Sequence, residues 1–152
     1  MVLARVLDER VWMLNRQGKA SIASSSQGHE AAEIGAVWAV RTAQDYIIFP
    51  YYRSLATNLA AGLTTKEILL SLLAKEGEPL SGARQFLMQG ASLKLKLINL
   101  SNVVGTQITQ AVGYALGARM MGQPLVALTT FGDGGASQGE FHEALNFAGI
   151  HK

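Results

Sequence analysis

The stretch that decides the fold reads LVALTTF at residues 125–131, GDGGASQG at residues 132–139 and EFHEALNFA at residues 140–148. The first part is apolar and rich in β-branched residues, and it follows the turn residues Gly122 and Pro124, as a strand would. The last part carries apolar residues at helical spacing. The middle is therefore predicted to cross from the carboxyl end of a strand to the amino end of a helix.

Open α/β sheets bind ligands at such a crossing, because free N–H groups and the positive end of the helix dipole attract phosphate. Gly132, Gly134 and Gly135 would let the backbone approach a ligand closely, and Asp133 places one carboxylate beside the phosphate. Mg²⁺ is usually held by few protein carboxylates together with substrate phosphates. The residues therefore favour a Mg²⁺–diphosphate site with Asp133 as the metal ligand.

Two alternatives to this site remain open from spacing alone. The first is a plain strand-to-helix turn that happens to contain an Asp, and Ser137 with Glu140 three residues later fits a capping box for its helix. The second is a dinucleotide site, since Gly132 and Gly134 begin the Rossmann fingerprint. The third glycine position of that fingerprint is Ser137, which makes the second alternative the weaker one.

Composition describes a globular chain. The 152 residues are 49% hydrophobic and 16% charged, which suits a single domain with a sizeable core. Thirteen basic residues against 11 acidic ones give a net charge of +2, so nothing favours nucleic acid as a partner. The absence of cysteine excludes disulfides and thiol catalysis and is typical of a cytoplasmic protein. No apolar run reaches membrane-spanning length.

The remaining hydrophobic pattern predicts an alternation of helices and strands. Asp8 is expected outside the apolar stripe of the first helix, and His29 at the start of the second. Thr64 and Glu67 form a capping box. Helices are expected at residues 2–15, about 27–40, 55–61, about 65–75 and about 106–121, and strands at residues 46–49 and 93–97.

Tyr52 and Arg53 follow the carboxyl end of the predicted strand at residues 46–49. Such a pair is commonly a packed aromatic beside a solvated cation. The planar fork of an arginine is also the preferred partner of a diphosphate, which makes Arg53 a second candidate for the phosphate site.

The whole pattern resembles a known family. GDGxxSQGEFHEALNFA at residues 132–148 resembles the thiamine-diphosphate motif of the alpha subunit of the first, decarboxylating component of 2-oxo acid dehydrogenase complexes, and the branched-chain type is favoured. The resemblance runs from about Ala4 to the end. The family motif closes with an Asn-Asn pair further on, so the resemblance implies that residues 1–152 are the amino-terminal part of a single thiamine-diphosphate-binding domain. The expected fold is α/β, a mostly parallel sheet flanked by helices and truncated at the carboxyl end.

The resemblance implies an oxidoreductase subunit that decarboxylates a 2-oxo acid on thiamine diphosphate and Mg²⁺ and passes the acyl group to lipoyl on the next component. The implied partners are a beta subunit, in an alpha2-beta2 heterotetramer, and a lipoyl-bearing acyltransferase. The carboxylate that activates the cofactor would come from the beta subunit. We therefore expect the isolated chain to be inactive, and the alternative is a non-catalytic assembly fragment that cannot bind cofactor alone.

The resemblance also implies roles for single residues. It assigns cofactor contacts to Tyr52, Arg53, the backbone of Asn102 and Val104, and Gly132, Asp133, Gly134 and Gly135, with Asp133 as the Mg²⁺ ligand. Ser101, Thr106 and Gln107 match a turn that holds a monovalent cation in some members. Residues 82–85 resemble a Gly-Gly-Arg-Gln stretch, after which the family carries a His near the pocket. This chain has Gln89 there, and an amide cannot carry a proton as an imidazole can.

Overall fold

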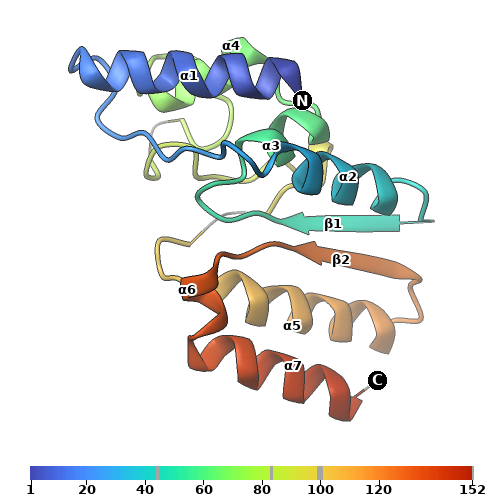
Figure 1. The fold of residues 1–152 in the computed structure, drawn as a ribbon. Helices are drawn as coiled ribbons and strands as arrows, with labels where there is room; N and C mark the ends of the chain where they lie inside the picture. The colour runs from blue at the N-terminus through green and yellow to red at the C-terminus, as the bar shows by residue number, and fades with distance from the viewer. Residues whose placement is uncertain (44, 83, 99–100, 152) are drawn as a thin grey trace.

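The structure is a computed structural model that describes residues 1–43, 45–82, 84–98 and 101–151, so the resemblance at residues 82–85 lies partly outside the described residues, at Ala83. It shows an α/β chain in which helices surround a small sheet (Figure 1). In chain order the elements are α1 (Val2–Arg16), α2 (Glu30–Val40), β1 (Asp45–Phe49), α3 (Leu55–Ala61), α4 (Thr65–Leu72), the 3-10 turn η1 (Leu93–Leu95), α5 (Thr106–Met120), β2 (Leu125–Thr129), α6 (Asp133–Ala136) and α7 (Gly139–His151).

The two strands of the described sheet, β1 and β2, run parallel, with Asp45 opposite Leu125 and Phe49 opposite Thr129. Helices α1 to α4 lie on the β1 side in Figure 1, and α5 and α7 lie on the β2 side. A parallel pair brings both carboxyl ends to one edge of the sheet. The predicted α/β class and the parallel pairing are therefore confirmed, and the two loops that follow the strands become neighbours.

Strand β1 is buried on both faces. Ile48 packs with the apolar residues of α1, α2 and α4, whereas Ile47 and Phe49 pack with Ala111 of α5. Successive side chains of a strand point to opposite faces, so neighbouring residues reach different cores. A strand covered on both sides needs an uninterrupted apolar run, which explains why residues 46–49 carry no polar alternation.

The position of Asp8 differs from the one expected for it on α1. It is buried at 2% exposure, although it was predicted outside the apolar stripe. One carboxylate oxygen accepts a hydrogen bond from the Ser25 hydroxyl at 2.8 Å, and the other accepts one from the Ser26 backbone N–H at 3.0 Å. The charge is buried because the loop before α2 supplies donors for both oxygens, which helical spacing cannot reveal.

The prediction of a strand at residues 93–97 is wrong. Residues 93–95 form the turn η1, and Lys96 has a left-handed backbone with φ 57°. Leu97 alone forms a bridge to Ile48, supported by hydrogen bonds from the Ile48 N–H to the Lys96 carbonyl at 2.8 Å and from the Ile98 N–H to the Ile48 carbonyl at 2.9 Å. The turn buries Leu97 but leaves Leu93 exposed, and Lys96 pairs there with Asp45.

Helix boundaries agree with the sequence at some ends and differ at others. The Thr64–Glu67 capping box of α4 is present as predicted, although the helix ends at Leu72. The Ser137–Glu140 box is wrong: Ser137 closes the short helix α6 and its hydroxyl donates to the Asp133 carbonyl, while α7 begins at Gly139. The glycines were expected to form an open crossing, but residues 133–136 make a helical turn of their own.

None of the helices within the described ranges combines the length and the apolar character that a membrane crossing requires.

Candidate functional site

A small cavity of about 80 Å³, here called the strand-end cavity, lies where the loops after β1 and β2 meet the segment before α5. The parallel strands bring these segments together, although they are far apart along the chain. Six of the eight residues predicted to contact a cofactor line this cavity: Tyr52, Asn102, Val104, Gly132, Gly134 and Gly135. Ser101 and Gln107 line it too.

Thr130 fastens three segments of the cavity wall. Its hydroxyl lies 3.3 Å from the Ser54 hydroxyl in the loop after β1, and its carbonyl accepts a hydrogen bond from the Gln107 side chain of α5 at 3.1 Å. The Ser54 hydroxyl also accepts from the Tyr51 N–H at 3.0 Å. These side-chain contacts hold the loops at fixed separation, as a preorganised binding site requires.

The glycines of the crossing differ in what they make possible. A Cβ at Gly134 would meet no atom within 4 Å, so the space beside the backbone at this residue is open. A Cβ at Gly132 would lie 3.9 Å from the Tyr51 ring. A Cβ at Gly135 would lie 3.2 Å from the Phe131 Cβ, which is tighter than ordinary packing. A side chain at Gly135 would therefore press on Phe131, whereas the space beside Gly134 is open.

Arg53 does not line the strand-end cavity but stands next to one of its walls. Its guanidinium lies 5.1 Å from the centre of the Tyr52 ring and donates a hydrogen bond to the Ser25 carbonyl at 3.0 Å. The Tyr52 ring in turn packs edge-on against Tyr51 at 5.3 Å. The cation is thus held by the loop before α2, beside the aromatic pair of the cavity.

Asp133, the predicted metal ligand, is exposed at the first position of α6. It is not among the residues that line the strand-end cavity, although Gly132 and Gly134 on either side of it are. No group of three or more His, Cys, Asp or Glu side chains in the described part of the chain is placed to hold a metal ion. The role of Asp133 as one carboxylate of a Mg²⁺ site stays a prediction.

A partly buried group of polar side chains beside the cavity has no signal in the sequence pattern. The Tyr51 hydroxyl lies 3.1 Å from Nδ1 of His29, so His29 contacts the loop after β1 and does not cap its own helix. Burial, with the nearby negative charge of Glu33, raises the pKa of Tyr51 to about 12. Burial also raises the pKa of Glu33 to about 7, while its Oε2 accepts from the Thr57 N–H at 2.9 Å.

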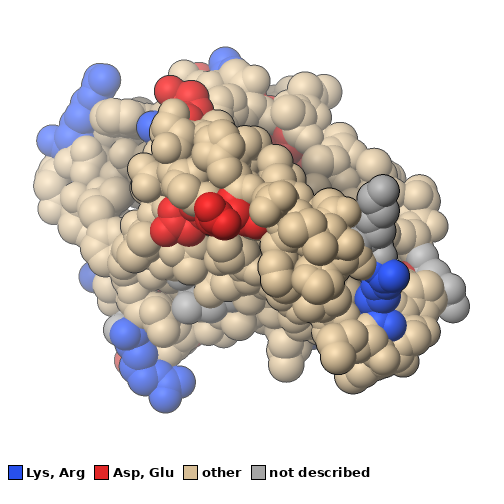
Figure 2. Space-filling view, turned by 90° about the horizontal axis from the view of Figure 1, so that it is seen from below, with Lys and Arg blue, Asp and Glu red and all other residues tan. Residues whose placement is uncertain are grey.

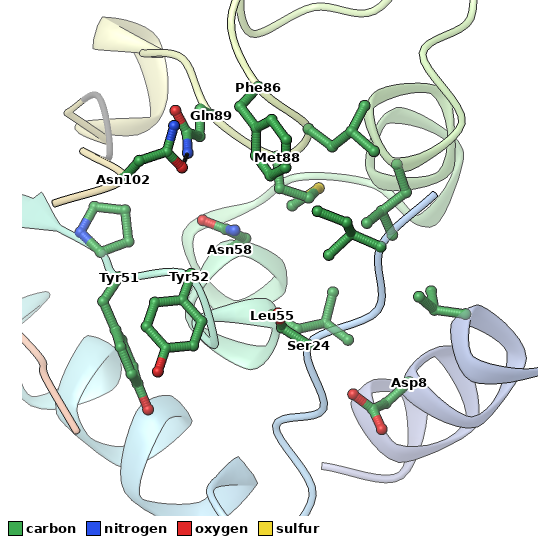
Figure 3. Close-up of a pocket in the computed structure, with 15 residues that line it drawn as sticks. Asp8, Ser24, Tyr51, Tyr52, Leu55, Asn58, Phe86, Met88, Gln89 and Asn102 are labelled. Atoms are coloured by element: carbon green, nitrogen blue, oxygen red, sulfur yellow. Dashed lines mark hydrogen bonds between the residues drawn. The ribbon is translucent and has the colours of Figure 1, made fainter. Parts of the chain in front are cut away.

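A second cavity of about 80 Å³, here called the side cavity, adjoins the first (Figure 3). Tyr51, Tyr52 and Asn102 line both cavities. Its other walls are largely apolar and include Leu55 and Met88.

A wide apolar groove of about 490 Å³ lies between α5, β2 and α7 and is here called the α5–α7 groove. Phe141, Leu145 and Phe147 of α7 line it together with Ile108 and Leu116 of α5. Figure 2 views the molecule from the α7 side and shows few charged side chains, separated by broad uncharged areas.

An α/β chain with a cavity at the carboxyl ends of parallel strands has the architecture of a broad class of binding folds. The sequence profile of the family described as "Dehydrogenase E1 component" matches residues 1–152, and the chain belongs to this family. This result confirms the resemblance in the glycine-rich motif.

Curated relatives agree with the family. The chain is 45% identical over 152 residues to the 2-oxoisovalerate dehydrogenase subunit alpha of Bacillus subtilis (strain 168), covering 100% of the chain and 46% of the relative. It is 36% identical over 152 residues to the pyruvate dehydrogenase E1 component subunit alpha of Bacillus cereus, covering 100% and 38%. It is 35% identical over 150 residues to the mitochondrial 2-oxoisovalerate dehydrogenase subunit alpha 2 of Arabidopsis thaliana, covering 99% and 31%. The chain therefore spans less than half the length of these relatives.

Proposed function

We propose that the chain provides the diphosphate-binding portion of the alpha subunit of a 2-oxo acid dehydrogenase. In this proposal the subunit decarboxylates a 2-oxo acid on thiamine diphosphate and Mg²⁺, and the acyl group passes to lipoyl on the next component. The observation that carries the proposal is the strand-end cavity, which gathers six of the eight residues assigned to the cofactor. Residues 1–152 are proposed to form the amino-terminal part of one thiamine-diphosphate-binding domain.

The residues around the strand-end cavity suit a diphosphate. The open backbone at Gly134 leaves room for phosphate oxygens close to the N–H groups of the crossing. Arg53 would offset the negative charge with the guanidinium nitrogens not bound to Ser25, and Tyr52 would donate a hydrogen bond beside it. The backbone of Asn102 and Val104 would hold the middle of the cofactor from the opposite wall.

The chemistry that bound thiamine diphosphate supplies is the stabilisation of negative charge on the carbon that loses carbon dioxide. The residues of this chain would position the cofactor and offset its negative charge. Asp133 would ligate the Mg²⁺ that joins the diphosphate to the protein, since Mg²⁺ takes few carboxylates and completes its shell with phosphate and water. Its exposed position at the start of α6 leaves the carboxylate accessible to a metal ion.

The proposed partners are a beta subunit, which would supply the activating carboxylate, and a lipoyl-bearing acyltransferase. A branched-chain 2-oxo acid is the favoured substrate, because the 45% identical relative is a 2-oxoisovalerate dehydrogenase subunit.

One observation favours a second candidate, a non-catalytic assembly role. The α5–α7 groove leaves apolar side chains such as Leu145 and Phe147 exposed, at 52% and 43%. Exposed apolar surface of this extent marks a contact with another chain or segment. An assembly fragment would use this surface without binding cofactor.

A chimaera separates the two candidates. Residues 1–152 replace the matching part of the Bacillus subtilis 2-oxoisovalerate dehydrogenase subunit alpha, and thermal unfolding is followed with Mg²⁺ and thiamine diphosphate. The proposed function predicts a rise in Tm that needs both ligands, because ligands that bind only the folded state stabilise it. Asp133→Ala should abolish the rise, whereas Glu143→Ala, an exposed carboxylate of α7, should retain it. A chimaera that shows no rise while the parent relative does would contradict the proposal.

A further inference from the structure

We propose that Gln89 is a positioning residue that fixes residues 101–105, here called the 101–105 turn, by holding Asn102 at the border between the strand-end cavity and the side cavity. The relevance of this inference to cofactor binding rests on the proposed function, because the turn is one wall of the proposed cofactor site. It concerns the position at which this chain departs from the family resemblance, where an amide replaces an imidazole.

The Gln89 side chain is buried and points toward Asn102. It is 4% exposed, and its Nε2 donates a hydrogen bond to the Asn102 side-chain oxygen. Figure 3 shows the two amides facing one another above the loop that carries Tyr51 and Tyr52. A buried amide donor that loses its partner retains the full cost of leaving water, so this contact resists separation.

The segment that carries Gln89 is itself fixed. The Met88 N–H donates to the Ser71 hydroxyl of α4 at 2.9 Å, and Met88 has a left-handed backbone with φ 62°. Gly90 has φ +131°, and a Cβ there would lie 2.6 Å from the Leu80 carbonyl carbon and oxygen. Only glycine fits against that backbone. Gln89 therefore projects from a segment whose neighbours on both sides are fixed by packing and hydrogen bonding.

Asn102 stands at the border of both cavities. It lines the strand-end cavity and the side cavity, whereas Gln89 lines only the side cavity. Within the turn, the Val103 N–H donates to the Ser101 hydroxyl at 3.1 Å, and the Thr106 N–H donates to the Val103 carbonyl at 3.4 Å. The second contact is longer than an ordinary N–H···O bond, so it adds little to the stability of the turn. The bond from Gln89 adds an anchor from outside the turn.

Gln89 and Asn102 both carry uncharged amide side chains. An amide donates and accepts without gaining or losing a proton, so the anchor has the same form at every pH at which the protein is folded. Gln89 thus acts through Asn102 and contacts no reacting atom.

Amide hydrogen exchange measured by NMR on the 152-residue chain tests the anchor without any cofactor. Gln89→Leu should speed exchange of the Val103 and Thr106 amides about tenfold, the ratio that a hydrogen bond worth ~1.4 kcal/mol provides. Exchange of the Met121 amide, at the far end of α5, should not change. Gln85→Leu is the matched control, because Gln85 is an exposed glutamine of the same segment and should leave the turn unchanged.

A variant that keeps Gln89 tests the inference even if Gln89→Leu unfolds the chain. Asn102→Ala, at an exposed position, should free the Gln89 side-chain amide and speed its exchange. Where Gln89→Leu folds, adding it to Asn102→Ala should cause no further change in the turn, since Gln89 acts only through Asn102. Unchanged exchange of the Gln89 side-chain amide in Asn102→Ala, equal exchange in the Gln89→Leu and Gln85→Leu chains, or additive effects in the double variant would each overturn the inference.

A binding measurement on the chimaera tests the link to the cofactor. Gln89→Leu should weaken binding of thiamine diphosphate with Mg²⁺ about tenfold relative to Gln85→Leu. Unchanged affinity together with faster exchange in the turn would overturn the role toward the cofactor. A parent chimaera that binds no cofactor would instead be a failure of the proposed function, visible before any Gln89 variant is made.

Discussion

Glu33 shows at the scale of one residue how burial sets a chemical property. Its side chain is buried at 4% exposure, and Oε2 accepts from the backbone of Thr57 in the first turn of α3. The other oxygen, Oε1, is buried without a hydrogen-bond partner among the described residues. Burial disfavours the charged form, which raises the pKa of Glu33 from 4.5 to about 7.

The first prediction concerns the pH dependence of stability. Because folding raises the pKa of Glu33, its favourable contribution is complete below pH 4.5 and is lost as the pH rises through 7. The free energy of unfolding should therefore fall by about 2 kcal/mol from this group between pH 5 and pH 8. Urea unfolding of the parent and of Glu33→Gln checks this, because the variant should lack that fall.

Glu9→Gln, an exposed carboxylate of α1, serves as the control and should keep the parent's slope. The ion pair of Arg5 with Glu30 does not affect this comparison. It lowers the pKa of Glu30 to about 2, so its contribution to stability changes with pH only below pH 4.5. Identical slopes for the parent and Glu33→Gln would show that Glu33 is ionised in the folded state at pH 5.

Helix α4 shows at the scale of one element how a four-residue pattern fixes a boundary. The Thr64 hydroxyl accepts from the Glu67 N–H at 3.2 Å, and the Glu67 carboxylate accepts from the Thr64 N–H at 2.8 Å. The two bonds satisfy N–H groups that have no partner within a helix. The bond from the Thr64 N–H, together with one from the Thr64 hydroxyl, stabilises the charged Glu67 carboxylate and lowers its pKa.

The second prediction follows from this box. Thr64→Ala should lower the free energy of unfolding by about 1 kcal/mol, because it leaves the Glu67 N–H without its acceptor. Thr65→Ala, at the first residue of α4, is the matched control and should cost less. Urea unfolding at pH 7 measures both. Equal costs for the two variants would mean that the box contributes nothing to stability.

The α5–α7 groove belongs to the scale of the whole molecule, because three elements from the last third of the chain form it. The third prediction is that the 152-residue chain binds a hydrophobic dye there and associates as its concentration rises, since exposed apolar surface favours contact with other apolar groups. Leu145→Arg should reduce both effects, as measured by dye fluorescence and sedimentation.

Leu93→Arg is the control for the groove, because Leu93 is 79% exposed but lies on η1, away from α7. It should leave dye binding and association close to those of the parent. If Leu93→Arg reduces association as much as Leu145→Arg does, the association surface is not the α5–α7 groove.

Much of the fold was predictable because its signals are local. The apolar runs of β1 and β2, the glycine that ends α3 and the Thr64–Glu67 box each involve residues within a few positions of one another. The glycine-rich crossing after β2 was visible for the same reason, since it is contiguous in the chain, whereas the cofactor roles of its residues stay predictions. The alternation at residues 93–97 misled because Lys and Leu two apart satisfy a tight turn as well as a strand.

By itself, the sequence determined the family and the α/β class, while the roles it suggests for single residues toward a cofactor stay predictions. The tertiary structure alone decided which distant groups meet: Asp8 with Ser25, Tyr51 with His29, Ser54 with Thr130, and Gln89 with Asn102. A local sequence pattern reflects the geometry of a helix or a strand, because side chains on one face recur with the period of that element. Contacts between elements depend on how the whole chain packs, and packing selects partners by shape, burial and unsatisfied hydrogen bonds that no short repeat encodes.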